Sequence, residues 1–256
     1  MLEYYKIFIK MFSWFRRKKI ILEPVDFSSL KTDIHSHLIP GIDDGAQNLE
    51  SSVEIIKKLM SLGYSRFITT PHIMNDLYRN TPEIILDGLK KLRAELTRLK
   101  IDVQIEAAAE YFVDYDFESK IGKEDFLTFG DKYILIEFSF LEKPQNIDEI
   151  IFKLQLEGYK VVLAHPARYL YLNLDDYKSF VNRGVYLQLN LLSLLVDAKG
   201  KSFESKKKQI SDMLSGDINL RSKKELIEQF IEENLLEIEN SEDVAETFQA
   251  YIAVKY

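Results

Sequence analysis

The chain has 256 residues, of which 46% are hydrophobic and 29% are charged, a balance that is ordinary for a globular protein. Its formal net charge of −7 argues against a nucleic-acid partner, because nucleic-acid binders normally carry a basic surface. The chain has no cysteine, which excludes disulfides, thiolate metal sites and cysteine nucleophiles and fits a reducing compartment such as the cytoplasm.

Residues 1–30 form a leader that is rich in aromatic and basic side chains. The leader lacks the roughly 18 consecutive apolar residues needed to span a bilayer. It also lacks the apolar core and the cleavage site of a signal peptide. One interpretation is a disordered leader, with translation starting at Met11. The other is a peripheral contact with the inner face of a membrane, since aromatic and basic residues together favour anionic interfaces.

Between residues 31 and 193, short apolar runs alternate with longer amphipathic segments. A helix is expected over Glu50–Leu62, because apolar residues recur there at helical spacing and Gly63 follows as a C-cap. A second helix begins at Pro82 and runs towards Lys100. The strands predicted around these two helices are Thr32–Ile34, Arg66–Thr70 and Ile101–Ala107.

The same alternation continues in the second half of this region. Helices are expected over Ile147–Glu157 and Asp175–Arg183, each followed by a glycine. The strands predicted here are Lys132–Phe138, Val161–Ala164 and Val185–Asn190. Strands that alternate with helices predict an α/β fold with a parallel sheet, either closed or open.

The pattern changes after Ser193, and we expect residues 194–256 to form a helical appendix without strands. Charged, modestly amphipathic stretches follow three residues that could cap helices, namely Ser205, Ser222 and Asn240. The predicted organisation is therefore a leader (1–30), an α/β domain (31–193) and an appendix (194–256).

Ionisable residues stand at or just after successive predicted strands. They are His35, His37, His72, Glu110, Glu137 and His165. The carboxyl ends of parallel strands meet at one edge, where active sites are assembled. Because side chains alternate along a strand, both imidazoles of His35-Ser36-His37 lie on one face. Asp43 and Asp44 follow in a glycine-flanked loop, and a histidine and carboxylate set without thiolates suits Mn, Fe or Zn.

Each of these residues also has a purely structural interpretation. A lone histidine is more often a core or surface residue than a ligand, but all four histidines fall on this predicted edge. Glu137 interrupts an apolar run, and a carboxylate in a buried strand needs a partner, a proton or a metal. Glu110 could be a solvated loop residue. Arg168 is either a phosphate clamp or a surface charge, and its closeness to His165 favours the clamp.

Four segments resemble the PHP-domain protein-tyrosine phosphatases of the CpsB/CapC type. They are Thr32–Gly45 (TDIHSHLIPGIDDG), Thr69–His72 (TTPH), Tyr133–Phe138 (YILIEF) and Val162–Arg168 (VLAHPAR). The resemblance spans residues 33–193 and implies a distorted (β/α)7 barrel with a trinuclear, usually manganese, centre. It implies that the metal ligands are His35, His37, Asp44, His72, Glu110, Glu137 and His165, with Arg168 contacting phosphate.

The resemblance also implies a function. Members of the family hydrolyse phosphotyrosine on the membrane-associated tyrosine kinases that control capsule and exopolysaccharide export. We therefore expect a cytoplasmic, metal-dependent hydrolase that uses a metal-activated hydroxide. Another PHP-type hydrolase, such as a histidinol-phosphate phosphatase or a nuclease subunit, stays an alternative.

The family pattern breaks after Ser193. The family has a closing strand that ends in Asp-x-His, whereas this chain has no histidine beyond His165, and Asp217-Ile218-Asn219 is the nearest remnant. Arg221–Phe230 resembles the C-terminal helical region of type I restriction-enzyme motor subunits, which indicates a fused or truncated gene product. We therefore expect an incomplete barrel that holds at most two ions tightly. A catalytically impaired protein that serves only for metal binding or interaction is the second alternative.

Overall fold

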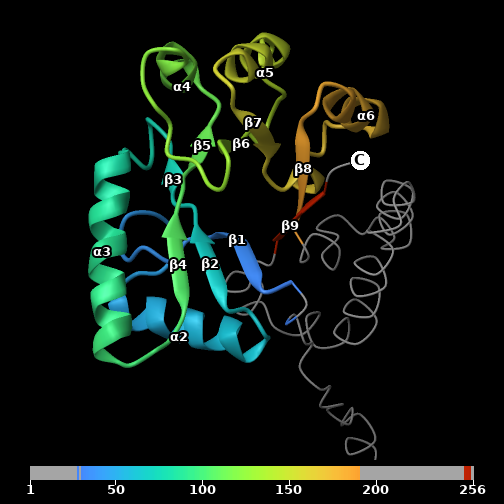
Figure 1. Ribbon diagram of the computed structural model, residues 1–256. Helices are drawn as coiled ribbons and strands as arrows, with labels where there is room; N and C mark the ends of the chain where they lie inside the picture. Colours follow the sequence, from blue (N-terminus) through green and yellow to red (C-terminus); the bar gives the residue numbers. More distant parts are fainter. Residues whose placement is uncertain (1–27, 29, 191–250, 255–256) are drawn as a thin grey trace, which may run out of the picture.

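The computed structural model describes residues 28, 30–190 and 251–254, which form a mixed α/β structure with two sheets (Figure 1). In the smaller sheet, β1 (Thr32–Ser36), β2 (Arg66–Thr69) and β4 (Gln104–Ala107) run parallel in that order. The larger sheet has the order β3 (His72–Ile73), β5 (Glu110–Phe112), β6 (Tyr133–Glu137), β7 (Lys160–Leu163), β8 (Tyr186–Asn190) and β9 (Tyr251–Val254). All its pairs are parallel except β8 with β9.

Backbone hydrogen bonds connect the two sheets where their strands follow one another. The amide of Ala108 donates to the carbonyl of Thr69, and the amide of Glu110 donates to the carbonyl of Pro71. The segments that carry β2 and β3 therefore stay beside those that carry β4 and β5. Since proline has no amide hydrogen to contribute, the regular ladder is interrupted at Pro71.

Two helices cover the smaller sheet. Helix α2 (Leu49–Ser61) begins with a capping box formed by Asn48 and Ser51, and α3 (Pro82–Arg98) begins with proline after the cap residue Thr81. Their apolar faces pack on the strands in one core cluster. This cluster includes Val53, Ile56, Leu59, Phe67, Leu89, Leu92, Leu96 and Ile105.

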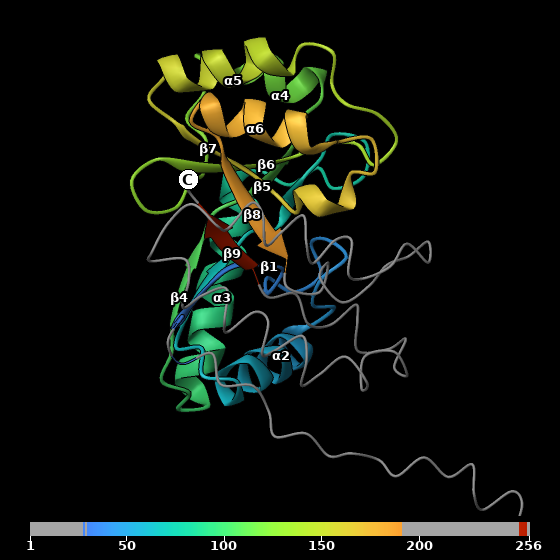
Figure 2. The same ribbon diagram turned by 90° about the vertical axis from the view of Figure 1, so that its right-hand side faces the viewer.

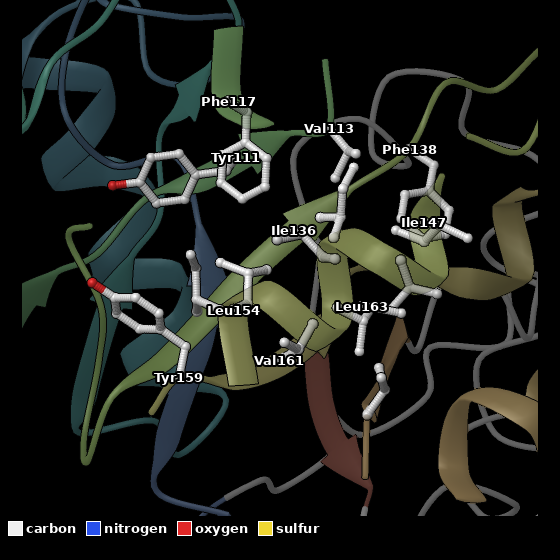
Figure 3. Close-up of a cluster of buried hydrophobic side chains, with 14 of the residues drawn as sticks. Tyr111, Val113, Phe117, Ile136, Phe138, Ile147, Leu154, Tyr159, Val161 and Leu163 are labelled. Atoms are coloured by element: carbon white, nitrogen blue, oxygen red, sulfur yellow. The ribbon is translucent and has the colours of Figure 1, made fainter. Parts of the chain in front are cut away.

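The larger sheet has a different packing on each face. Three helices accompany it, namely α4 (Tyr115–Lys120), α5 (Ile147–Leu156) and α6 (Leu174–Asn182). The main core cluster contains residues of all three helices together with Tyr111, Ile136, Val161 and Leu163 (Figure 3). A smaller cluster of Leu135, Val162 and Ala164 comes from alternate positions of the same strands, so it lies on the opposite face.

Most expected elements are confirmed, with shifts of a few residues. The strand expected over Ile101–Ala107 begins only at Gln104, and the helix expected over Asp175–Arg183 is one residue earlier. The two-residue strand β3, the short strand β5 and helix α4 were not expected, because they are too short to show a periodic pattern. The expected leader and the helices of the appendix lie outside the described residues.

Strand β9 corrects the prediction that no strand follows Ser193. It pairs antiparallel with β8, with Gln188 opposite Ala253, and it lies beside β1 (Figure 2). Its sequence, Tyr-Ile-Ala-Val, is rich in strand-forming residues but only four residues long, so it gave no usable signal. An unpaired edge of β8 would expose its backbone groups, and β9 covers this edge.

None of the helices within the described ranges is long and apolar enough to cross a membrane.

We expect a chain ending at Ala250 to be less stable than one ending at Val254, which keeps β9. Losing the β8–β9 ladder removes a few backbone hydrogen bonds, worth about 2 kcal/mol, and this should lower Tm by roughly 4–8 °C. Thermal unfolding of the two truncated proteins measures the difference, and light scattering reports association through the exposed edge. Equal Tm values would show that β9 contributes nothing to the fold.

Candidate metal centre

All the histidines of the chain and two buried glutamates converge at the carboxyl ends of the strands. Three groups have possible ligand atoms within 4.8 Å of one another. They are His35, Glu110 and His165; His37, Asp44 and His72; and His72, Glu110 and Glu137. The prediction that His35, His37, Glu110, Glu137 and His165 come together on one face is confirmed.

Strand register explains why these side chains meet. His72 on β3 lies directly opposite Glu110 on β5, so the two side chains leave the sheet on the same face. Glu110 is in turn opposite Leu135 on β6, and Glu137 stands two residues further along the same face. The apolar cluster of Leu135, Val162 and Ala164 also belongs to this face.

Glu110 is the centre of the arrangement. Its Oε2 lies 3.0 Å from Nε2 of His35 and 3.2 Å from Nδ1 of His72. The same oxygen lies 3.3 Å from Nε2 of His37, and Oε1 lies 2.8 Å from Nε2 of His165. Burial alone would raise the pKa of this carboxyl, but the surrounding histidines hold the pKa well below its ordinary value. Glu110 is therefore an ionised carboxylate without contact to bulk water.

Glu137 is a second buried carboxylate in the same place. Its Oε1 lies 2.7 Å from Nδ1 of His72, yet neither atom has a hydrogen-bond partner of acceptable geometry among the described residues. Burial and repulsion from Glu110 raise the pKa of Glu137. Two facing ligand atoms without a hydrogen bond, beside a second carboxylate, are what a shared cation requires. The donor set therefore fits divalent metal ions.

Asp43 and Asp44, adjacent in sequence, have different roles. Asp44 is exposed, with Oδ1 3.5 Å from Nε2 of His72 and 3.7 Å from Nδ1 of His37. Asp43 is buried: its Oδ2 lies 2.8 Å from Nδ1 of His37 and accepts a hydrogen bond from the amide of His72. Asp43 therefore orients His37 and links the loop after β1 to β3. The sequence predicts for Asp43 only the role of a possible carboxylate ligand, and its role in orienting His37 is a finding of the structure.

The loop that carries Asp43 needs a glycine beside His37. A Cβ atom at Gly45 would lie 2.3 Å from the Cβ atom and from the carbonyl oxygen of His37, which is too close for any side chain. The amide of Gly45 also donates to Oδ1 of Asp43. The glycine at this position therefore lets the loop fold back against the histidine.

Gln188 was missed by the sequence analysis. Its Oε1 lies 2.7 Å from Nδ1 of His35, and both side chains are fully buried. The signal that could have found it is the one that indicated Glu137, namely a polar residue that interrupts an apolar strand.

Arg168 is placed by an unusual backbone turn. His165 has the left-handed conformation, with φ 32° and ψ 53°, which is strained for a residue with a side chain. The turn leads into η1 (Pro166–Arg168), and Arg168 lies exposed at its end. Burial lowers the pKa of His165, and the positive charge of Arg168 adds to this effect. Arg168 is therefore near the site without being buried in it.

Aromatic rings flank the histidines. Tyr78 stacks on His72 with ring centroids 5.4 Å apart, and Phe140 lies 6.1 Å from the ring of His165. Phe140 is more than half exposed, and so are Leu141, which follows it, and Leu77, which precedes Tyr78. The surface around the site is thus apolar as well as charged.

The chain matches the family described as "Capsular polysaccharide synthesis, CpsB/CapC" over residues 31–218. It belongs to this family. Residues 186–256 also match a second description, "Type I restriction and modification enzyme - subunit R C terminal". The two matches overlap in a segment that begins at β8.

Relatives with phosphatase names agree with this assignment. The tyrosine-protein phosphatase YwqE of Bacillus subtilis (strain 168) is 34% identical over 137 residues, 53% of this chain and 54% of that protein. The tyrosine-protein phosphatase CpsB of Streptococcus agalactiae is 27% identical over 207 residues, 80% of this chain and 79% of that protein. The chain thus spans about half the length of the B. subtilis relative.

A similar fold has been solved in crystal structures of YwqE from B. subtilis and CpsB from Streptococcus pneumoniae, described as unique metal-dependent tyrosine phosphatases. The matched chain has a TM-score of 0.66 and 26% identity, and the match covers 88% of this chain and 100% of the other.

We expect the metal-free protein to lose stability as the pH rises above about 6.5, the ordinary pKa of a histidine. Burial would lower the pKa of His37, but its contacts with Asp43 and Glu110 outweigh burial and raise the pKa well above its ordinary value. A histidine whose pKa is higher in the folded than in the unfolded protein stabilises the fold. This stabilisation is complete at a pH below the pKa of the unfolded protein, and it is lost as the pH rises through the pKa of the folded protein. Thermal unfolding in the presence of a chelator measures this loss.

His37→Gln provides the control, because it removes the titrating ring while leaving the other shifted groups in place. Its Tm should fall less steeply over the same pH range. A wild-type Tm that rises with pH, or an unchanged slope in His37→Gln, would contradict the prediction.

Proposed function

We propose that the protein is a metal-dependent protein-tyrosine phosphatase. Its substrate would be a phosphotyrosine on a membrane-associated tyrosine kinase of capsule or exopolysaccharide synthesis. The observation that carries the proposal is the convergence of Glu110, Glu137 and all four histidines beside Arg168. Family membership and the names of the relatives support the same chemistry.

The metal ligands that we propose are His35, His37, Asp44, His72, Glu110, Glu137 and His165. Nitrogen and oxygen donors without sulfur suit manganese, and also iron or zinc. Glu110 belongs to two of the three groups, so it would help to hold two ions. His35 and His165 would complete one ion, and His72 and Glu137 the other.

A third ion would have fewer protein ligands than the first two. His72 faces Glu110 and Glu137 with Nδ1 but faces Asp44 with Nε2. A neutral imidazole has only one lone pair for coordination, so His72 serves one ion at a time. His37 and Asp44 then remain, and two protein ligands are fewer than the three that catalytic sites usually keep.

The residues divide the catalytic work between them. When bound, divalent ions activate water as a nucleophile and neutralise charge on the phosphoryl group. Glu110 and Glu137 hold negative charge in a place without bulk water, which favours cation binding. Arg168 presents planar donors at the exposed rim, where they suit phosphoryl oxygens. No thiol takes part, since the chain has no cysteine.

For the architecture, we propose a distorted (β/α)7 barrel in residues 31–193, followed by an appendix that supplies its last strand. The pairing of β9 with β8 and its position beside β1 support closure by an antiparallel strand. This replaces the open barrel that we expected from the sequence. We also propose a cytoplasmic location. The aromatic and basic composition of residues 1–30 supports a peripheral contact with the membrane.

A catalytically impaired member of the family is the second candidate, and one observation favours it. Strand β9 lies at the edge of β8, but Tyr251, Ile252, Ala253 and Val254 include no histidine or carboxylate. Among the described residues, no metal ligand is therefore contributed from beyond β8.

We expect the purified protein to hydrolyse a phosphotyrosine peptide when Mn²⁺ is added, to lose this activity with a chelator, and to keep it after thiol alkylation. Arg168→Ala should lower kcat/KM on the order of 10- to 100-fold, because a charged hydrogen bond to the phosphoryl group is lost. Arg183→Ala is the matched control, since Arg183 is also exposed but pairs with Asp148.

Three results would decide against this function. They are turnover that survives exhaustive chelation, preference for histidinol phosphate or single-stranded DNA over phosphotyrosine, and equal effects of the two arginine substitutions. Tight Mn²⁺ binding without turnover of any of these substrates would favour the impaired candidate.

We expect the protein to retain at most two metal equivalents tightly. The reason is that His72 cannot serve both neighbouring groups while neutral. Metal analysis after dialysis measures the number, and Glu110→Gln should reduce it most, because Glu110 contributes to both ions. Glu106→Gln, an exposed change on β4, is the control. Three tightly held equivalents would show that a further ligand exists.

A further inference from the structure

Gln188 is a buried polar residue that makes one short contact with the site. Its Oε1 lies 2.7 Å from Nδ1 of His35 across a long separation in sequence. The opposite ring nitrogen, Nε2, lies 3.0 Å from Glu110 and 3.2 Å from Nε2 of His37. One nitrogen of His35 therefore faces Gln188, and the other faces the metal centre.

The chemistry of the contact determines where the proton lies. An amide oxygen can only accept a hydrogen bond, so Nδ1 of His35 carries a hydrogen when it bonds to Gln188, and Nε2 can coordinate an ion only when it carries none. In the neutral ring the lone pair is then on Nε2, the atom directed at the site. We propose that Gln188 is a positioning residue, which holds His35 in the Nδ1–H tautomer and in the rotation that directs Nε2 at the metals.

Asp43 offers a comparison within the same site, because it contacts Nδ1 of His37 in the same way. The two histidines thus have one charged and one neutral partner. A carboxylate in place of Gln188 would add negative charge beside Glu110 and near Asp33, whose Oδ1 accepts a hydrogen bond from the amide of His35. A neutral acceptor orients the ring without adding this repulsion.

The paired backbone around Gln188 fixes the position of its side-chain amide. Strand β8 pairs with β7 on one side and with β9 on the other, where Gln188 lies opposite Ala253. A residue in the middle of paired strands keeps its side-chain direction better than a loop residue does. The inference rests on the proposed metal centre but not on the identity of the substrate.

The tautomer can be observed directly, because the chain has only four histidines. Long-range ¹H–¹⁵N spectra of the protein loaded with diamagnetic Zn²⁺ distinguish Nδ1–H from Nε2–H, and His35→Gln assigns the signals. We expect a hydrogen-bonded Nδ1–H in the wild type. In Gln188→Leu we expect the Nδ1–H signal to lose its hydrogen-bonded shift and the affinity for Mn²⁺ to fall about 10- to 100-fold.

Two further variants separate positioning from packing. Gln188→Glu keeps an acceptor oxygen, so it should retain the Nδ1–H tautomer even if the protein is less stable. Gln155→Leu removes a different glutamine hydrogen bond, to the carbonyl of Arg183, and should change neither the tautomer nor Mn²⁺ affinity.

The inference is overturned by an Nε2–H tautomer in the wild type. It is equally overturned by an unchanged Nδ1–H signal and an unchanged Mn²⁺ affinity in a folded Gln188→Leu protein. If Gln188→Leu does not fold, the wild-type and Gln188→Glu spectra decide. A wild type with the Nδ1–H tautomer and Gln188-dependent Mn²⁺ binding, but without phosphotyrosine turnover, supports the inference while the proposed function fails.

Discussion

A single ionised carboxylate, Glu110, is surrounded by histidine rings in a place that bulk water does not reach. Removing such a charge from water costs several kcal/mol unless hydrogen bonds and opposite charges compensate. The rings of His35, His72 and His165 provide this compensation in the metal-free protein. Cations would provide it more fully in the loaded protein. Glu110 is the first residue of β5, just after the break between β4 and β5.

Apolar packing on the opposite face of the larger sheet offsets the free energy needed to bury this polar cluster. There the aromatic rings of Tyr111, Phe117, Phe126 and Tyr159 pack together. The tyrosine hydroxyl groups also form hydrogen bonds: that of Tyr111 accepts one from the amide of Leu127, and that of Tyr159 accepts one from the amide of Phe126. Hydrophobic burial on one face thus allows charge burial and backbone strain on the other, as is common at functional sites.

The sequence predicted those parts of the structure that depend on local pattern. Apolar runs predict the strands, and Glu137 is predicted as a site residue because it interrupts such a run. The difference between Asp43 and Asp44 could not be predicted, because adjacent residues in a loop share the same local signal and only the folded turn at Gly45 separates them. The role of Gln188 depends on a contact with a residue at the other end of the domain. Such long-range pairings leave no periodic trace in the sequence.

Strand β9 extends the larger sheet by backbone pairing, and its four residues include no histidine or carboxylate. Backbone pairing uses amide and carbonyl groups that every residue except proline offers, so many sequences can cover the edge of β8. Metal coordination instead needs particular side chains at particular positions. The segment that resembles restriction-enzyme subunits begins at Tyr186, so it shares β8 with the phosphatase family. Gln188 lies in this shared strand and contacts His35. Within residues 30–190, the ligand groups end at His165, so the support of the centre extends beyond them to β8.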